Sequence, residues 1–182
     1  SSDVCSSDLD GSPCTNLAVW SAAGGLEPVR ATGDGFTHRL NLTYKPNDDV
    51  MFYGTWSRGF RPGGINRRAD VAPYAPDYLT NFELGWKTTL GSLRFNGAVY
   101  QQNWSNFQFS YLGANSFTEI HNGPDARIRG IETDINYSAN GLSITASASY
   151  TDAKTTQNLC TIDDPTYACL GAGNFIAAPR GT

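Results

Sequence analysis

Apolar and polar residues alternate one by one over long stretches of this chain, and this pattern restricts the fold more than any other feature. In the clearest stretch, residues 141–151 (GLSITASASYT), apolar side chains hold the even positions and Ser or Thr hold the odd positions from 143 onward. A period of two residues places successive side chains on opposite faces of a β-strand. The same alternation recurs in residues 39–45, 81–88 and 92–100, and no stretch fits a helical period better. We therefore expect an all-β fold.

The expected strands are longer than those of most soluble proteins, and their connections are of two kinds. Six strands are expected, at about residues 36–45, 50–60, 78–90, 93–111, 116–137 and 142–155. Compact turns follow the first, third and fifth strands, whereas longer polar segments such as residues 61–77 follow the others. Long strands with tight turns at one end and long loops at the other are typical of outer-membrane barrels. The sequence therefore predicts an antiparallel meander within a larger transmembrane β-barrel, since six strands are too few to close one.

Composition and motifs exclude several other classes of protein. The chain has 13 Lys and Arg against 17 Asp and Glu, a formal net charge of −4, which argues against a basic nucleic-acid-binding face. No apolar run approaches the roughly 20 residues that a membrane-spanning helix needs. The two histidines, His38 and His121, are accompanied by no G-x-S-x-G, P-loop, H-E-x-x-H or G-x-G-x-x-G motif. We expect no enzyme, no cofactor and no resident metal.

The two faces of the expected sheet differ in chemistry. If the apolar side chains face lipid, the charged residues between them line a polar lumen. The residues expected on this lumen wall are Glu83, Lys87, Arg94, Glu132 and Asp134. One stretch fits this scheme less well, because Arg127 and Arg129 share a face with Ile131. Either these arginines lie above the membrane or a β-bulge interrupts the alternation.

Three segments, taken in order along the chain, resemble a known family. They are Ser57–Gly64 (SRGFRPGG), Asn81–Lys87 (NFELGWK) and Ala126–Glu132 (ARIRGIE). In order and spacing, over residues 36–156, they resemble the C-terminal part of the barrel of TonB-dependent outer-membrane receptors. The resemblance implies a barrel of about 22 strands that is closed by an N-terminal plug domain.

The resemblance also implies a function. Such receptors take up ferric siderophores or similarly large nutrients, with energy delivered by the TonB complex through the N-terminal part. The implied partners are outer-membrane lipid and lipopolysaccharide, the plug domain, the TonB complex and the ferric ligand, with long loops extracellular and short turns periplasmic. Two alternatives stay open: a passive porin barrel, and a secreted β-sandwich binding module with shorter strands.

The chain is expected to be a fragment of a longer protein, because it lacks an initiator Met and ends in a loop-like stretch. Residues 1–9 (SSDVCSSDL) share nothing with the rest and are interpreted as a non-native junction. Residues 10–35 are expected to form an extracellular loop or irregular lead-in. Residues 36–156 form the expected barrel segment, and residues 157–182 a truncated extracellular loop.

The loop at residues 61–77 is the candidate for ligand contact. Its candidate residues are Arg61, Arg67, Arg68 and Tyr74. A cluster of Arg and Tyr attracts anionic chelates through charge-assisted hydrogen bonds. The alternative is that these arginines form ion pairs with other loops or with lipopolysaccharide phosphates.

Two further groups of side chains have a ligand interpretation and a structural one. The charged wall residues are near enough along adjacent strands to form ion-pair ladders, which would either satisfy the wall itself or dock a plug and guide substrate. A cluster of aromatic residues either grips an aromatic or sugar ligand or packs across strands. Its members are Trp104, Phe107, Phe109 and Tyr111.

Four cysteines form two sequence-local pairs. Cys160 and Cys169 bracket a polar segment with an Asp-Pro turn signal, which suits a disulfide that staples a loop in an oxidising compartment. A zinc site is the alternative, although the spacing is wide and only two histidines could help. Cys5 and Cys14 are left unassigned.

Overall fold

The computed structural model describes residues 18–20, 22, 24–28, 30–66, 71–112, 118–160, 167–170, 174 and 176–181. This part of the chain consists of β-strands joined by turns and irregular segments. None of the described residues belongs to a helix that could cross a membrane. The predicted all-β class is confirmed.

The chain divides into two compact units, which are named here for their content. The sheet unit comprises Phe36–Phe60, Tyr78–Ser105 and Pro124–Thr182. The loop unit comprises Ser1–Gly35, Arg61–Asp77 and Asn106–Gly123.

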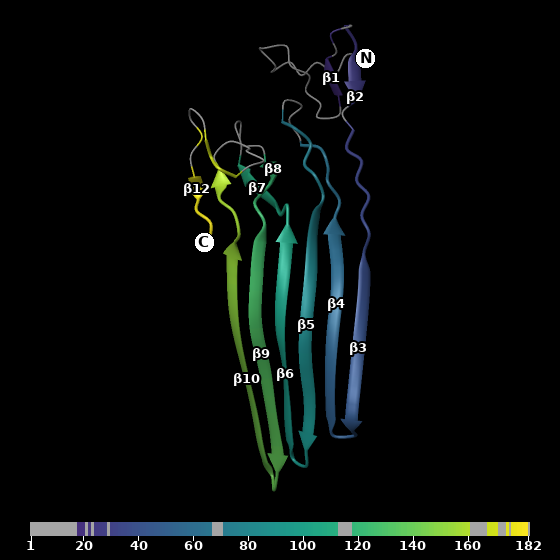
Figure 1. Cartoon of the computed structure of the whole chain (residues 1–182), viewed down its shortest axis with the longest axis vertical. Coiled ribbons are helices and arrows are strands. Elements are labelled where there is room, and N and C mark those ends of the chain that lie inside the picture. The colour runs from purple at the N-terminus through teal and green to yellow at the C-terminus, as the bar shows by residue number, and fades with distance from the viewer. Residues whose placement is uncertain are drawn as a thin grey trace. The chain divides into compact units, whose positions relative to one another are not determined.

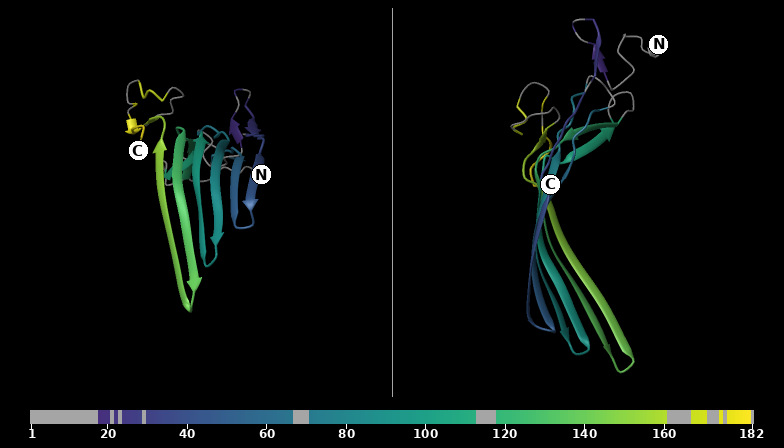
Figure 2. Two further views of the ribbon diagram at one scale, coloured as in Figure 1. Left: turned by 60° about the horizontal axis from the view of Figure 1, so that its bottom comes forward. Right: turned by 90° about the vertical axis from the view of Figure 1, so that its right-hand side faces the viewer.

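Six long strands form the main sheet. They are β3 (His38–Asn47), β4 (Val50–Arg61), β5 (Asp77–Leu90), β6 (Leu93–Ser105), β9 (Ala126–Ala139) and β10 (Leu142–Thr155). Their order across the sheet is β10-β9-β6-β5-β4-β3, and neighbours run in opposite directions (Figure 1). The sheet is a single curved layer (Figure 2). The predicted six-stranded antiparallel meander is therefore confirmed.

Tight turns join the strands in pairs at one end of the sheet, the lower end in Figure 1. The β9–β10 turn is Asn140-Gly141, and both residues have positive φ, 53° and 79°. Two residues with positive φ form the type of turn whose twist matches a β-hairpin, which explains why Asn and Gly occupy these positions. The β5–β6 turn likewise contains Gly91 at φ 57°.

Continuous register gives the sheet one apolar face. Along one row, Leu84 pairs with Val99, Val99 with Ile131, and Ile131 with Tyr150. These four side chains are 65%, 40%, 41% and 68% exposed. The apolar stretch of β10 from Leu142 to Tyr150 is about 27 Å long at the usual rise of an antiparallel strand, enough for the apolar band of a membrane barrel when tilted.

The sheet lacks the core that a soluble domain of this size would have. Among the described hydrophobic residues, Ala98 and Cys169 are buried, with 5% and 8% of their surface exposed, whereas many large apolar side chains are exposed. A contiguous apolar face of this extent marks a surface that is covered by lipid or by another protein. The apolar and polar faces thus follow the alternation that the sequence predicted.

Aromatic rings on the sheet lie across glycines of the neighbouring strand. A Cβ atom added at Gly130 would lie 2.4 Å from Cζ of Tyr100, and one at Gly85 would lie 2.3 Å from Cζ of Tyr53. The Tyr100 ring crosses Gly130 and its hydroxyl forms a 3.0 Å hydrogen bond with Thr151 of β10. Glycine is needed at these strand positions because the rings occupy the space of a side chain.

Two of the predicted long strands are each divided into two shorter ones. The stretch 93–111 is interrupted after β6, and the stretch 116–137 is interrupted before β9. Asn106 has φ 53°, which ends the extended conformation of β6. Gly123 and Pro124 interrupt the second stretch shortly before β9 begins. The strands between β6 and β9 are β7 (Gln108–Leu112) and β8 (Thr118–Asn122), which form their own antiparallel pair.

Each end region contains a pair of short strands, one within the stretch predicted as an extracellular loop or irregular lead-in and one within the stretch predicted as a truncated extracellular loop. The first are β1 (Ala18–Trp20) and β2 (Leu26–Pro28), which pair within the stretch 10–35. The second are β11 (Leu159–Cys160) and β12 (Ile176–Ala178), which pair within the stretch 157–182. Residues 1–9, interpreted as a junction, lie outside the described residues.

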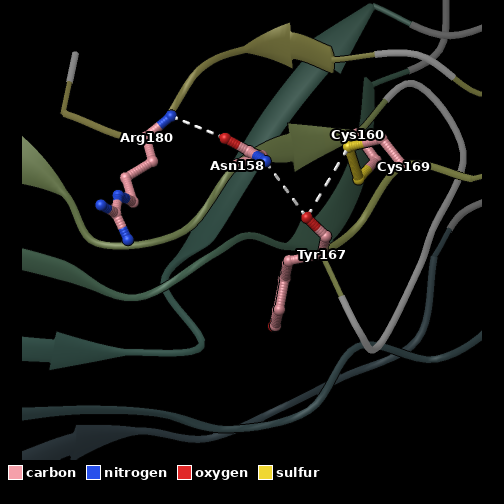
Figure 3. Close-up of a disulfide and its surroundings, with 5 residues drawn as sticks. All are labelled: Asn158, Cys160, Tyr167, Cys169 and Arg180. Carbon is pink, nitrogen blue, oxygen red and sulfur yellow. Dashed lines mark hydrogen bonds between the residues drawn. A yellow bond between two sulfur atoms is a disulfide. The ribbon is translucent and has the colours of Figure 1, made fainter.

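Cys160 and Cys169 form a disulfide beside β11, with a Cα–Cα distance of 5.2 Å (Figure 3). The Asn158 side chain holds the same region together, since its Nδ2 donates to the Tyr167 carbonyl at 3.4 Å and its Oδ1 accepts from the Arg180 amide at 2.8 Å. The disulfide and this amide side chain join three separate parts of the C-terminal segment. Cys5 and Cys14 lie outside the described residues.

Candidate functional site

The ends of β4 and β5 carry the first element of the candidate site, an ion pair inside the loop unit. Arg61 Nε donates to both carboxylate oxygens of Asp77 at 3.1 Å, and Arg61 Nη2 lies 2.5 Å from Asp77 Oδ2. Asp77 is 2% exposed, while the Arg61 side chain is 53% exposed. The hydrogen bond to this carboxylate raises the pKa of Arg61 above its usual value. Arg61 is therefore held by a carboxylate at the other end of its own loop.

Asp77 and Gln108 together connect the loop 61–77 to strand β7. The Gln108 backbone amide donates to Asp77 Oδ2 at 3.1 Å, and its carbonyl accepts from Arg61 Nη2 at 3.2 Å. The Gln108 side chain donates to the carbonyls of Pro62 and Ala75, both at 3.0 Å. Gln108 of β7 thus forms hydrogen bonds with residues at both ends of the loop 61–77.

Two asparagines make equivalent connections to strand β8. Asn122 donates to the Ala75 and Asn106 carbonyls at 2.9 Å and accepts from the Ala75 amide at 2.6 Å. Asn66, which is 4% exposed, donates to the Ile120 carbonyl and accepts from the Ile120 amide at 2.9 and 2.7 Å. In both cases an amide side chain takes the place of a backbone partner, which holds an irregular loop without regular backbone pairing.

Gly63 and Gly64 lie close against Tyr74 within the loop 61–77. Gly64 and Tyr74 exchange two backbone hydrogen bonds of 3.1 and 3.0 Å. A Cβ at Gly64 would lie 2.4 Å from the Tyr74 hydroxyl, and one at Gly63 would lie 2.3 Å from the Tyr74 carbonyl oxygen. Gly63 is thus required by close backbone approach, and Gly64 by the Tyr74 ring that lies against it.

The candidate loop residues are only partly brought together. Arg61 and Tyr74 both make contacts that shape the loop, and their role toward a ligand stays a prediction. Arg67 and Arg68 lie outside the described residues.

Strands β7 and β8 present aromatic and ionisable side chains. Phe107 and Phe109 pack with ring centroids 5.8 Å apart, and Phe109 lies 6.4 Å from the His121 ring. His121 Nε2 lies 3.6 Å from Glu119 Oε2, and Glu119 is 7% exposed. Trp104 lies in β6 of the sheet unit, opposite Leu79 and Ala126, and the side chain of Tyr111 is outside the described part. None of the described His, Cys, Asp and Glu residues forms a group of three placed to hold a metal.

The five charged wall residues share the polar face of the sheet, but the expected ion-pair ladder does not form. Among the described residues no two of them lie within ion-pair distance, because the register places each charge opposite a neutral residue: Glu83 opposite Tyr100, Lys87 opposite Asn96, and Arg94 opposite Thr89 and Asn136. Glu132 lies opposite Ala98 and Ser149. Asp134 accepts hydrogen bonds from Asn96 at 2.8 Å and Asn136 at 3.3 Å instead.

Sequence reasoning missed the residues that organise the loop unit. Asn66, Asp77, Gln108 and Asn122 carry its hydrogen bonds, yet nothing in their spacing marks them as partners. The only signal was their type, since Asn, Asp and Gln beside a Gly-Pro-rich loop commonly bond to backbone groups.

The sheet has one apolar and one polar face, and amide side chains hold the loop 61–77. A family model described as "TonB dependent receptor-like, beta-barrel" matches residues 15–180. The chain belongs to this family. The resemblance inferred from the three sequence segments is thereby confirmed. TonB-dependent receptor barrels are outer-membrane proteins, and the six-stranded sheet corresponds to part of such a barrel.

A solved structure of the same family has a similar fold. "The FrpB iron transporter from Neisseria meningitidis (F3-3 variant)" superposes with a TM-score of 0.56 at 14% sequence identity. The match covers 76% of this chain and 22% of the transporter. At this identity the likeness concerns the fold, and this chain spans about a fifth of that transporter's length.

Proposed function

We propose that this chain forms part of an active outer-membrane transporter that takes up a ferric siderophore or a similarly large nutrient with energy from TonB. The membership of the TonB-dependent receptor family carries this proposal. It agrees with the description of the structural neighbour as an iron transporter. In this proposal the partners are a plug domain and the TonB complex.

The exposed apolar face supports a position in the membrane. A single-layer sheet whose large apolar side chains point outward would be unstable in water, and lipid is the simplest cover for it. The polar face would then line the lumen, where Glu83, Lys87 and Glu132 stay hydrated or contact a plug.

We place the long connections outside the cell and the tight turns in the periplasm. Barrels of this kind have short periplasmic turns and longer extracellular loops. The long connections would then form part of the entrance, and the hydrogen bonds of Asn66, Gln108 and Asn122 would keep residues 61–77 in one conformation. A rigid loop loses less conformational entropy when a ligand binds.

Uptake by the full-length protein tests the transport proposal. The protein would be expressed in a host that lacks its own siderophore receptors, and cells would be given radioactive iron bound to catecholate, hydroxamate or carboxylate siderophores. We expect uptake of at least one of these chelates, and loss of that uptake in a strain without TonB. Uptake that continues without TonB would support a porin instead.

Labelling of intact cells tests the orientation. Ala72, in the long loop, and Asp48, in a tight turn, are both exposed and would each be replaced by cysteine. A maleimide that cannot cross the outer membrane should label Ala72→Cys and leave Asp48→Cys unlabelled until the cells are lysed. The reverse pattern would contradict the proposed orientation.

A further inference from the structure

Strands β7 and β8 form a separate antiparallel pair, and their register shows which backbone groups point outward from it (Figure 1). In such a pair, residues that exchange two backbone hydrogen bonds alternate with residues whose N–H and C=O groups point away from the partner strand. The Gly123 amide donates to the Phe107 carbonyl at 2.7 Å, which marks these two as a hydrogen-bonded pair. The next residue on each strand is therefore of the outward kind. The outward residues are Gln108, Ser110 and Leu112 in β7 and Thr118, Ile120 and Asn122 in β8.

Side chains of the long loop between β4 and β5 occupy part of both outer edges. The amide of Ile120 donates to Asn66 Oδ1 at 2.7 Å, and its carbonyl accepts from Asn66 Nδ2 at 2.9 Å. The amide of Gln108 donates to Asp77 Oδ2 at 3.1 Å, and its carbonyl accepts from Arg61 Nη2 at 3.2 Å. Both residues bond away from the pair, which agrees with the register. In each case side chains take the place that a neighbouring strand would have.

The outer edge of β7 is open beyond Gln108. Ser110 is exposed, and Leu112 is 70% exposed. Within the part of the chain that the structure describes, the outward amide and carbonyl groups of these two residues form no hydrogen bond. We call Ser110 and Leu112 the open edge. An unpaired strand edge presents a row of donors and acceptors with which another extended chain can pair.

The backbone groups of the open edge match those of an extended peptide. Ser110 and Leu112 present amide and carbonyl groups in alternation, with a repeat of about 6.8 Å for two residues of an antiparallel strand. A peptide in the extended conformation carries the complementary groups at the same repeat, and three of its residues span both positions. The first and third of these residues form hydrogen bonds, while the second points its backbone groups away.

The charge next to the open edge sets the direction of such a peptide. Arg61 Nη2 donates to the carbonyl of Gln108, which directly precedes the amide of Ser110 along the edge. The Arg61 side chain is 53% exposed, whereas its carboxylate partner Asp77 is 2% exposed. The solvent-facing charge at this end is therefore positive, and it favours the terminal carboxylate of a peptide.

We infer that the open edge binds the last three residues of a peptide, antiparallel to β7, with the terminal carboxylate beside Arg61. The carboxylate accepts from the Ser110 amide, and the N–H group of the same peptide residue donates to the Ser110 carbonyl. The peptide residue two positions earlier exchanges the same two bonds with Leu112. This inference goes beyond the proposed function, because binding at the edge requires no transport.

Binding of tripeptides to the purified full-length protein tests the inference. The probe is a mixture of N-acetylated tripeptides with free carboxylates, varied at all three positions. Bound members are identified by mass spectrometry after equilibrium dialysis. We expect the protein to retain a subset of the mixture, and retention of no tripeptide would overturn the inference.

Two substitutions at Ser110 form a matched pair. Ser110→Pro removes the outward N–H group and leaves the bonds between β7 and β8 in place, since proline is tolerated at an edge position whose N–H faces solvent. Ser110→Ala keeps that N–H group and removes only the hydroxyl. We expect Ser110→Pro to weaken binding of the retained tripeptides about tenfold or more, and Ser110→Ala to change it less than about threefold. Equal binding to the two variants would contradict pairing at this edge.

Methylated peptides test the same bonds without altering the protein. In the best-retained tripeptide, an N-methyl group on the third residue removes the donor to the Ser110 carbonyl, whereas one on the second residue points away from β7. We expect the first to weaken binding about tenfold and the second less than about threefold. Replacing the terminal carboxylate by an amide should weaken binding about fivefold. Equal binding of the two methylated peptides, or of the acid and the amide, would overturn the inference.

These outcomes separate the inference from the transport proposal. Tripeptide binding that Ser110→Pro weakens, in a protein that takes up no ferric chelate, would support the open edge and contradict the transport function. TonB-dependent uptake by a protein that retains no tripeptide would contradict the open edge alone.

Discussion

The sheet unit and the loop unit are stabilised by different kinds of interaction. In the sheet unit, long backbone ladders hold the strands while side chains such as Leu42 and Leu84 stay 75% and 65% exposed. In the loop unit, a few buried polar side chains hold irregular backbone, with Asn66 and Asp77 only 4% and 2% exposed. Stability is therefore spread over many residues in the sheet and concentrated in few residues in the loops. Substitutions should reveal this difference.

The largest effect is expected for a charge placed on the apolar face. Ala148 lies near the middle of the apolar band of β10, and the adjacent Ser149 lies on the polar face. Ala148→Arg should destabilise the full-length protein in a bilayer by about 3 kcal/mol, whereas Ser149→Arg should cost less than about 1 kcal/mol. Urea unfolding in lipid vesicles, followed by Trp fluorescence, measures both. Equal effects would mean that the apolar face is not in lipid.

Loss of the buried carboxylate should have a similar effect that is confined to the loops. Asp77→Ala leaves the Gln108 amide without its acceptor and Arg61 without its ion-pair partner, at a cost of about 2 to 3 kcal/mol. Hydrogen exchange should become faster in residues 61–77 and 106–123 and stay unchanged in β9 and β10. Faster exchange throughout the sheet would show that the two units unfold together.

A side chain added under an aromatic ring should destabilise the sheet by about 2 kcal/mol. Gly130→Val forces the Tyr100 ring away from its position across β9. Combining it with Tyr100→Ala should recover part of the loss, because the clash is then absent. Gly59→Val is the control, since a Cβ at Gly59 meets no atom within 4 Å. The test compares the urea midpoints of the unmodified protein, Gly130→Val, Gly130→Val combined with Tyr100→Ala, and Gly59→Val.

The smallest effect is expected for an exposed ion pair. Asp152→Ala removes the partner of Lys154, and both side chains are partly exposed, at 38% and 51%. The change in unfolding free energy should stay below about 1 kcal/mol. A loss as large as that of Asp77→Ala would contradict the contrast between exposed and buried carboxylates.

The sequence predicted the sheet well because a strand repeats one simple rule. Alternation from Leu142 to Tyr150 fixes which side chains share a face, and the Asn140-Gly141 pair fixes the turn. The same rule failed at Asn106 and at Gly123, where a single backbone conformation ends a strand without disturbing the alternation around it. A positive φ at an asparagine is not visible in the hydrophobic pattern.

The candidate site was predictable only in part, because its contacts join residues far apart in the chain. Arg61 was recognised by its charge, but its partner Asp77 was not, because the ion pairs considered for this arginine were with other loops or with lipopolysaccharide. Asn66 bonds to Ile120, 54 residues away, and a polar residue in a loop carries no signal of such a distant partner. The charged wall residues were predicted on the polar face, where the structure has them. Which neutral residue lies opposite each charge depends on the strand register, and the alternation pattern does not define that register.

The pairing of β6 with β9 has a consequence for how this protein can evolve. Trp104 and Ala126 are direct partners, so the chain leaves the sheet and returns to it at a single point. The intervening segment, with β7 and β8, can be exchanged for one of different length or chemistry without shifting any pair of the ladder below. Natural variation can therefore remodel this loop while the wall is inherited unchanged.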